Sequence, residues 1–338
     1  MAALLEARHL RVDLHTQRGT ATAVRDVSFT LERGDTLGLI GESGCGKSLT
    51  ALALIGLQPE GARVSGSLRL DGQELVGLAD RGWRRLRGNR IAIIFQEPMT
   101  ALNPVHRVGA QIAEPLRLHR GLGAQAAREK AIALMARVGI PEPARRVDSF
   151  PHQFSGGQRQ RLMIAMALAC EPDVLIADEP TTALDVTVQQ QILALIRELV
   201  AERGMALVLI SHDLGLIAQN ARQMLVMYGG AVVESGPAAS VFHHPAHPYT
   251  RGLLAARPSL AQRLVAHRGD RLPTIPGTVP DLFHLPPGCP FAGRCPFTED
   301  PCFTDTPPRV DLDARHRFWC RRAQVVLRAA GLADEDTA

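Results

Sequence analysis

The chain has 338 residues, a formal net charge of +4, 46% hydrophobic residues and 21% charged residues. At about 100–200 residues per domain, this length suggests two domains or one large domain with an appendage. The longest apolar run, 162–170, is much shorter than the roughly 18–20 residues of a membrane helix. The small net charge does not indicate a nucleic-acid-binding protein, and the N-terminal sequence lacks the pattern of a signal peptide.

Residues 1–235 alternate between short apolar runs and helical segments, which predicts an α/β fold with a parallel or mixed sheet. We expect buried strands at 37–40, 91–95, 174–177 and 206–210. The Ala-, Leu- and Arg-rich segment from Glu114 to Arg146 predicts a helical insertion, whose subdomain we place at about 100–160. A further helix is expected from about Thr187 to Glu202.

The last hundred residues differ in composition from the rest. Of the 23 prolines, 14 lie between Pro237 and Pro308, and four of the six cysteines lie in the same part of the chain or just beyond it. Long helices and strands are not expected there. We therefore place one domain at 1–235 and a small extension at 236–338, held together by something other than a large core.

Residues 41–48, in sequence GESGCGKS, fit the phosphate-binding pattern G-x-x-x-x-G-K-[ST] between a strand and a helix. Backbone N–H groups of such a loop wrap phosphate oxygens at a helix N-terminus. The side chain of Lys47 then reaches the β- and γ-phosphates, and the Ser48 hydroxyl joins Mg²⁺. The candidate nucleotide-binding residues are Gly41, Glu42, Ser43, Gly44, Cys45, Gly46, Lys47 and Ser48.

The predicted strand at 174–177 ends in two carboxylates, Asp178 and Glu179. Ligands of open α/β sheets bind at the carboxyl ends of the strands. We expect Asp178 to orient the Mg²⁺ shell and Glu179 to accept a proton from the water that attacks the γ-phosphate.

Further motifs resemble those of ABC ATPases. Residues 154–158, FSGGQ, resemble the family's LSGGQ signature, with Phe154 in place of the leading Leu. Gln96 is similar to the Q-loop glutamine, 183–185 (ALD) to the D-loop, and His212 to the switch histidine. Six motifs occur in the family's order over residues 41–212. The expected fold is therefore a P-loop NTPase, an ABC nucleotide-binding domain with a helical subdomain and a small Pro- and Cys-rich C-terminal extension.

The resemblance implies a head-to-tail dimer with ATP between the two nucleotide domains. Four signature residues would face the phosphates bound by the other subunit: Ser155, Gly156, Gly157 and Gln158. It further implies that Asp185 belongs to the nucleotide site, that Gln96 links Mg²⁺ and water to a membrane partner, and that His212 senses or stabilises the γ-phosphate.

One position departs from the family pattern. The family usually stacks an aromatic residue on adenine, whereas the equivalent place here holds Leu14, followed by His15. A looser preference between ATP and GTP is therefore expected.

A narrower resemblance covers nearly the whole chain. The segments FQEPMTALNP, FPHQFSGGQ, IADEPTTALDVTVQ and HPYT (247–250) are similar to ATP-binding subunits of dipeptide and oligopeptide importers. The resemblance implies ATP hydrolysis that drives import through two permease subunits, with an extracytoplasmic binding protein and a second, homologous ATPase subunit. It places the chain peripherally on the cytoplasmic face of the bacterial inner membrane, without a nucleic-acid partner.

The extension contains Cys289, Cys295, Cys302 and Cys320. Four thiolates can hold an iron–sulfur cluster or Zn²⁺, and this spacing leaves both open. Disulfides are disfavoured for an ATP-using protein in a reducing compartment. Some dipeptide-importer ATPases carry a similar pattern around a [4Fe–4S] cluster, so the resemblance favours iron–sulfur, with zinc as the alternative and a structural role in either case.

Two other functions fit the sequence less well. A soluble ABC ATPase of nucleic-acid repair or translation usually has two nucleotide domains in one chain, long coiled-coil insertions or a strongly basic surface, and none of these occurs here. The signature motif and His212 disfavour a P-loop kinase.

Overall fold

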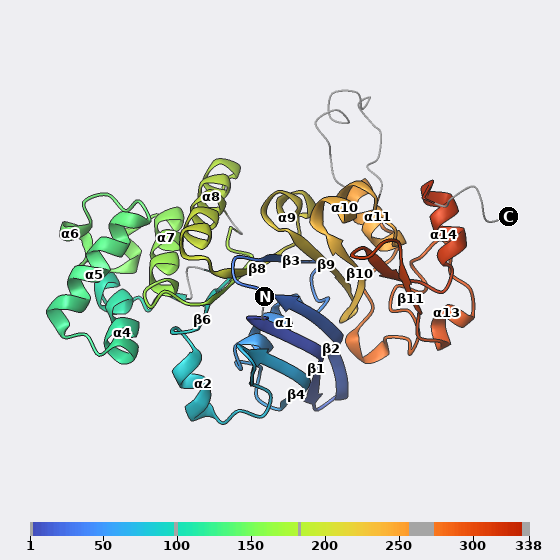
Figure 1. Cartoon of the computed structure of the whole chain (residues 1–338), viewed down its shortest axis with the longest axis horizontal. Helices are drawn as coiled ribbons and strands as arrows, with labels where there is room; N and C mark the ends of the chain where they lie inside the picture. Colours follow the sequence, from blue (N-terminus) through green and yellow to red (C-terminus); the bar gives the residue numbers. More distant parts are fainter. Residues whose placement is uncertain (1–2, 98–100, 182–183, 257–273, 333–338) are drawn as a thin grey trace.

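The computed structural model describes residues 3–97, 101–181, 184–256 and 274–332 (Figure 1). The strands are β1 (Leu5–Thr16), β2 (Gly19–Leu31), β3 (Thr36–Ile40), β4 (Ala62–Leu70), β5 (Gln73–Glu74), β6 (Ile91–Ile94), β7 (Val174–Asp178), β8 (Ala206–Ser211), β9 (Gln223–Tyr228), β10 (Ala231–Pro237), β11 (Arg309–Asp311) and β12 (Arg317–Trp319). The α-helices are α1 (Lys47–Leu54), α2 (Asp80–Leu86), α4 (Val108–Arg120), α5 (Ala124–Arg137), α6 (Pro143–Arg146), α7 (Gly156–Ala167), α8 (Val186–Arg203), α9 (Leu214–Asn220), α10 (Ala238–His243), α11 (Pro248–Ala255), α13 (Pro301–Thr304) and α14 (Ala323–Ala330). Two 3₁₀ turns span Pro151–Gln153 and Leu282–His284.

The strands form one mixed sheet in the order β5-β4-β1-β2-β10-β9-β3-β8-β7-β6. Strands β9, β3, β8, β7 and β6 are parallel, whereas β1, β2, β4 and β5 pair antiparallel. The predictions of a mixed sheet and of strands at β3, β6, β7 and β8 are confirmed. Because β6, β7 and β8 are parallel neighbours, their carboxyl ends lie along one edge, which is where the predicted catalytic residues follow.

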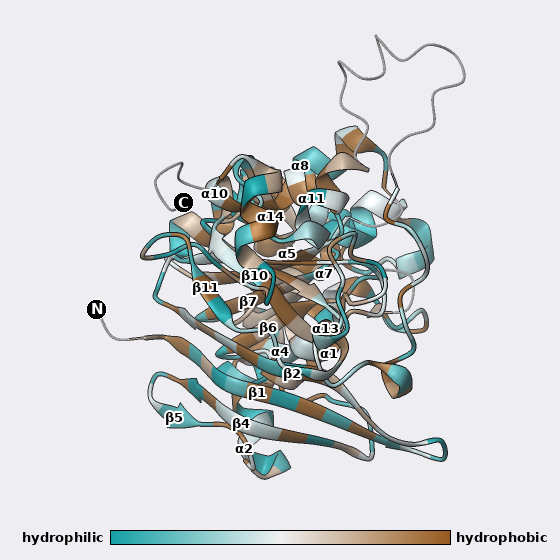
Figure 2. Ribbon diagram, turned by 90° about the vertical axis from the view of Figure 1, so that its right-hand side faces the viewer, coloured by the Kyte–Doolittle hydropathy of each residue, from teal (hydrophilic) through white to brown (hydrophobic). Residues whose placement is uncertain are grey.

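The parallel strands are buried on both faces because their side chains alternate between two apolar cores. In β8, Val208 and Ile210 pack into the core that contains α1, while Leu207 and Leu209 pack into the core that contains α7 and α8. Strand β1 packs only one face in this way, and Figure 2 shows polar and apolar residues alternating along it. Burial of these apolar side chains therefore fixes the sheet, and with it the strand ends, between the layer that contains α1 and the layer that contains α7 and α8.

Helices α4 to α7 form the helical part of the molecule, at the left of Figure 1. Helix α4 already begins at Val108, ahead of the predicted Glu114, and Pro115 lies inside it. The predicted helix at 187–202 corresponds to α8, whose buried residues Ile192, Ile196 and Leu199 lie on one face. The limits of about 100–160 for the helical subdomain remain a proposal.

The C-terminal extension is joined to the sheet, which the sequence did not predict. Strand β12 pairs antiparallel with β10 through Glu234 and Ser235, and β11 pairs with β12. The proposed domain boundary at 235/236 falls inside β10, whose last residues still pair with β9. The extension's own buried core is small, with Ala246, Phe318 and Val326 at its centre, as expected for a segment rich in proline.

Glu234 is fully buried at this junction. Its carboxylate accepts hydrogen bonds from the backbone N–H groups of Ala246 and His247, at 2.8 and 2.9 Å. The third partner is His316 Nε2, at 2.8 Å. All three partners come from the extension, so this acidic group ties the extension to the sheet.

Among the residues that the structure describes, no helix has both the length and the apolar character needed to cross a membrane.

Candidate nucleotide-binding site

The loop of residues 41–48 connects β3 to α1, as the motif predicts. Gly46 caps α1 with a left-handed backbone (φ 100°), and a Cβ at this position would lie 2.5 Å from the Ala23 carbonyl oxygen. A Cβ at Gly41 would lie 2.2 Å from the Met227 carbonyl oxygen. Only glycine fits at these two positions, because the loop backbone packs directly against β2 and β9.

Lys47 is the first residue of α1 and is 5% exposed. Its Nζ donates to the carbonyl oxygens of Gly41 and Glu42, at 2.7 and 3.0 Å. The ammonium group is therefore held inside the curve of the loop, at the N-terminus of a helix, where an anion is favoured.

Asp178, at the end of β7, is buried, and its Oδ1 has no hydrogen-bond partner among the described residues. Burial raises the pKa of this carboxyl group, while a hydrogen bond with the Ser48 side chain opposes the shift. A buried carboxylate oxygen without a partner, beside a hydroxyl, is the oxygen donor set that Mg²⁺ prefers. Asp178 and Ser48 thus fit a magnesium ion.

Glu179, Gln96 and His212 come together although they are far apart in the sequence. They follow three neighbouring parallel strands, β7, β6 and β8. Gln96 Nε2 and His212 Nδ1 each lie 3.3 Å from Glu179 Oε2. The Glu179 side chain is 15% exposed, and its backbone is left-handed (φ 44°), which is rare for a residue with a side chain. The geometry is that of a carboxylate held between two polar side chains at the edge of the sheet.

The signature residues lie on a different element. Ser155 caps α7, its Oγ accepting from the Gln158 N–H at 3.3 Å, while Gln158 Oε1 accepts from the Ser155 N–H at 3.2 Å. Ser155 and Gly156 are exposed. Within the described ranges no hydrogen bond joins 155–158 to 41–48, and Figure 1 shows α7 away from α1. This helix N-terminus is therefore presented to solvent rather than to the chain's own phosphate loop.

Asp185 caps α8, accepting from the Val188 N–H at 2.9 Å. Ala183, the first residue of the predicted D-loop, lies outside the described residues. Leu14 is half-buried in β1 and packs against the apolar core that contains α1, while the exposed His15 ring bonds the Thr20 hydroxyl at 2.9 Å.

The cysteines predicted to hold a metal, Cys289, Cys295, Cys302 and Cys320, all line one small cavity of about 20 Å³. Burial raises the pKa of Cys289 to about 11 and that of Cys320 to about 12, so both thiols are protonated at neutral pH. In the part of the chain that the structure describes, no group of three or more His, Cys, Asp or Glu side chains is placed to hold a metal ion. The predicted [4Fe–4S] or zinc site is therefore not seen as a formed set of ligands among the described residues, although the four thiols share one cavity.

Two residues that contact the phosphate loop were not identified from the sequence. The Tyr249 hydroxyl accepts from the Glu42 N–H, at 2.7 Å, and Arg294 Nη1 lies 2.8 Å from Glu42 Oε2. Tyr249 belongs to the HPYT segment (247–250), which carried the resemblance to peptide-importer subunits but did not predict this contact. Nothing in the sequence near Arg294 pointed to a residue 252 positions away.

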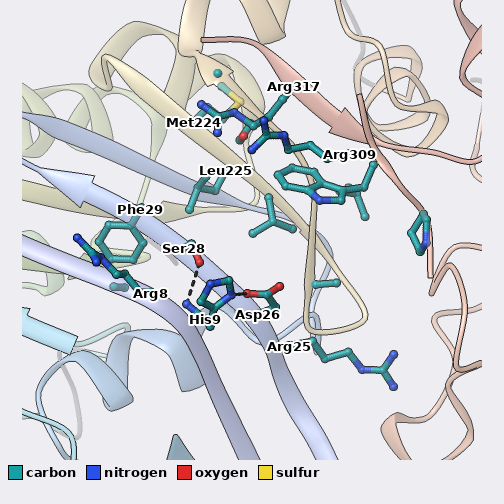
Figure 3. Close-up of a pocket in the computed structure, with 18 of the residues that line it drawn as sticks. Arg8, His9, Arg25, Asp26, Ser28, Phe29, Met224, Leu225, Arg309 and Arg317 are labelled. Carbon is teal, nitrogen blue, oxygen red and sulfur yellow. Dashed lines mark hydrogen bonds and ion pairs between the residues drawn. The ribbon is translucent and has the colours of Figure 1, made fainter. Parts of the chain in front are cut away.

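A second concave surface, a groove of about 1560 Å³, lies between β1–β2, β9–β10 and the extension. Figure 3 shows His9 in this groove, with its ring 2.6 Å from Asp26 and its backbone N–H 2.8 Å from the Ser28 hydroxyl. Seven arginines line the groove: Arg8, Arg11, Arg25, Arg222, Arg309, Arg315 and Arg317. None of the phosphate-loop, signature or strand-end residues lines it, so it is separate from the nucleotide site.

Comparisons with known proteins agree with this geometry. A family model described as ABC transporter matches residues 24–182, and one described as oligopeptide/dipeptide transporter, C-terminal region, matches 233–302. A peptide import ATP-binding protein of Brucella abortus (strain 2308) is 53% identical over 307 residues, 90% of this chain and 91% of the relative. One of Brucella melitensis is 46% identical over 331 residues, 96% of this chain and 98% of the relative.

Two solved structures are similar in fold. A dimeric ATP-binding cassette in a post-hydrolysis state, bound to ADP and Pi, has a TM-score of 0.62 at 25% identity, covering 69% of this chain and 98% of that one. The cbiO1 protein of Clostridium perfringens, part of an ABC transporter complex, has a TM-score of 0.60 at 26% identity, covering 72% of this chain and 92% of that one.

Proposed function

We propose, since the chain belongs to the family of ABC transporter ATP-binding proteins, that it is the ATP-hydrolysing subunit of a peptide importer. The observation that carries the proposal is the meeting of Gln96, Glu179 and His212 at the strand ends next to the phosphate loop. The match of residues 233–302 to the oligopeptide/dipeptide transporter region supports peptides as the cargo.

The residues divide the work of hydrolysis between them. The loop N–H groups and Lys47 bind the triphosphate, and Ser48, Asp178 and Gln96 are the residues that would hold Mg²⁺. The metal, when bound, neutralises charge on the phosphates. Glu179 takes a proton from the attacking water molecule while the oxygen of that water bonds to the γ-phosphorus. The bond between the γ-phosphorus and the β–γ bridging oxygen breaks, which gives ADP and phosphate. His212, 3.3 Å from Glu179, orients that carboxylate and contacts the γ-phosphate.

The exposed signature supports a head-to-tail dimer. Ser155, Gly156, Gly157 and Gln158 present a helix N-terminus and a hydroxyl to solvent, a combination that binds phosphate. In such a dimer these residues and Asp185 meet the nucleotide held by the other subunit's loop. The dimeric state of a structural neighbour supports this arrangement. We propose a second, homologous ATPase subunit as the partner.

The remaining partners follow from the same function. We propose two permease subunits, contacted near Gln96 and the helical part of the chain, and an extracytoplasmic peptide-binding protein that selects the cargo. The chain then acts peripherally, on the cytoplasmic face of the bacterial inner membrane, without nucleic acid. A role in nucleic-acid repair or translation is not favoured, because the peptide-import relatives match over most of the chain.

Reconstitution tests the proposal. The chain is co-expressed with candidate permease subunits from the same organism and placed in liposomes with the binding protein and a labelled peptide. We expect ATP-dependent peptide uptake that is lost with Lys47→Ala. ATP hydrolysis without uptake of any peptide, together with bound nucleic acid after purification, would replace this function by the alternative one.

For the cysteines, we propose that the four thiols take up a thiolate-bound metal centre, a [4Fe–4S] cluster in preference to Zn²⁺. The support is that all four line one cavity in a segment with little core of its own. Anaerobically purified protein should absorb near 400 nm, roughly where iron–sulfur clusters absorb. Colourless protein with stoichiometric zinc would leave only the zinc alternative, and protein without either metal would end the proposal.

A further inference from the structure

Glu42, the second residue of the phosphate loop, is held from two sides by the C-terminal extension. Its backbone N–H donates to the Tyr249 hydroxyl at 2.7 Å. Its carboxylate receives two guanidinium nitrogens of Arg294, at 2.8 and 3.4 Å. The Glu42 carbonyl accepts from Lys47 Nζ at 3.0 Å, so the backbone groups and side chain of this residue are all engaged.

Arg294 is fixed in place by the extension itself. It is 9% exposed, and its Nε donates to the Pro276 carbonyl oxygen at 2.8 Å. Its Nη1 also donates to the Tyr228 hydroxyl at 3.0 Å, and its Nη2 to the Ile275 carbonyl oxygen at 3.4 Å. A guanidinium with its donors engaged in this way is a rigid, permanently charged partner for a carboxylate.

Aromatic rings connect this arginine to the cysteine-lined cavity. Tyr228 packs against Tyr249 and Phe291, with ring centroids 4.6 and 5.1 Å apart. Phe291 also lines the cavity together with Cys295, the residue next to Arg294. The contact with the phosphate loop is thus supported by a cluster of aromatic rings from β9 and the extension.

The charge of Glu42 makes this contact matter for nucleotide binding. A carboxylate in a loop that wraps a triphosphate repels it, and partial burial strengthens the repulsion. Arg294 supplies the compensating positive charge from outside the loop. The Tyr249 hydroxyl accepts from the Glu42 N–H, and so fixes the turn of the backbone at Glu42.

We propose that Arg294 and Tyr249 are positioning residues of the nucleotide site: they neutralise and orient Glu42, so that the extension sets the affinity of the phosphate loop for ATP. The inference rests on the proposed function. It gives the extension a direct part in the ATPase cycle, in addition to any structural role.

The test measures the dissociation constant of a fluorescent ATP analogue with Mg²⁺, on the full chain, with thermal melting as a check of folding. Arg294→Met should raise Kd about tenfold, as expected when a buried charged hydrogen bond is lost. Tyr249→Phe, which removes one hydroxyl, should raise it about threefold. Arg309→Met is the matched control, because Arg309 also lies in the extension but pairs locally with Asp311 at 2.9 Å. The Kd of this variant for the analogue should equal that of the wild type.

The double variant Glu42→Gln/Arg294→Met separates the charge effect from a packing effect. If Arg294 acts by neutralising Glu42, removal of the carboxylate restores most of the affinity that Arg294→Met loses. If Arg294 only packs the extension, Arg294→Met raises Kd by the same factor in the Glu42→Gln background as in the wild type. Should Arg294→Met not fold, Arg294→Lys keeps the charge without the planar fork and should bind with an intermediate Kd.

Unchanged affinity in Arg294→Met, or the same loss from Arg294→Met in the Glu42→Gln background as in the wild type, overturns this inference. A wild-type chain that fails to bind the analogue would instead overturn the proposed function, so the two failures are distinguishable.

Discussion

His212 Nδ1 lies 3.3 Å from Glu179 Oε2, across the ends of the neighbouring strands β8 and β7. The same oxygen is 3.3 Å from Gln96 Nε2, at the end of β6. One carboxylate oxygen therefore faces both polar residues, and only the parallel order of three strands brings them together. This relationship makes Glu179 the residue whose replacement is most informative.

Glu179→Gln keeps the shape of the side chain and removes its ability to accept a proton. We expect ATP hydrolysis to fall about 10²–10⁴-fold, the usual contribution of a general base, while ATP binding persists. Size-exclusion chromatography with ATP should then show a trapped dimer. Normal turnover in this variant would mean that another group takes the proton.

Lys47→Ala should lower ATP affinity by about two orders of magnitude, because it removes the ammonium group that the loop holds for the phosphates. Lys130→Ala is a natural control, since Lys130 is the chain's other lysine and lies exposed on α5. Isothermal titration with ATP and Mg²⁺ measures both. Equal losses in the two variants would contradict a specific role for Lys47.

Because Leu14 has no aromatic ring, the base of the nucleotide should lack a stacking partner at this position, and selectivity between ATP and GTP should be weak. We expect the dissociation constants for ATP and GTP to differ by only about threefold, and Leu14→Tyr to strengthen ATP binding by a similar factor, since aromatic stacking is worth roughly 0.5–1.5 kcal/mol. Competition between the two nucleotides provides the measurement. Strong selectivity of the wild type for ATP would show that other residues hold adenine.

His247 should make the protein sensitive to acid. Burial lowers the pKa of its ring to about 3, and its Nδ1 accepts from the Tyr249 N–H. Above pH 6.5 the ring is neutral in both states; as pH falls below 6.5, only the unfolded chain gains the proton. This group then lowers the free energy of unfolding by about 1.4 kcal/mol per pH unit.

His247→Asn retains an acceptor for the N-terminus of α11 and removes this titration. Denaturant unfolding between pH 5 and 6.5, roughly the range where histidine alone titrates, should show a shallower loss of stability for the variant than for the wild type. Identical slopes would show that other groups cause the loss.

The residues of the nucleotide site could be predicted from the sequence better than the long-range contacts around them. Motifs such as residues 41–48 and the pair Asp178–Glu179 are local, and their spacing reflects the chemistry that they perform. Buried strands could be predicted because a short apolar run such as 206–210 indicates a strand buried on both faces in an α/β chain. The order of β6, β7 and β8, and hence the contact of Glu179 with His212, could not be predicted from any local pattern and is seen only in the structure.

Contacts between residues far apart in the sequence could not be predicted from a local pattern. Strand β12 has three residues, too few for a periodic pattern, and its pairing with β10 is decided by the burial of Phe318 and the partners of Glu234. The contact between Arg294 and Glu42 depends on the packing of Tyr228, Tyr249 and Phe291 in three dimensions. The four cysteines shared a cavity as the pattern suggested, yet cysteine spacing alone did not decide between the possible states of the thiols.

The buried carboxylate of Glu234 has a consequence for how the protein could be divided. A fragment that stops after β10 would keep the acid in the sheet and lose all three groups that bind it, at a cost of roughly 3–5 kcal/mol. It would also leave the stretch of β10 at Glu234 and Ser235, beyond the pairing of Ala231 with β2, unpaired and open to other chains. Residues 1–235 are therefore not an independent module, because part of their stability comes from groups of the C-terminal extension.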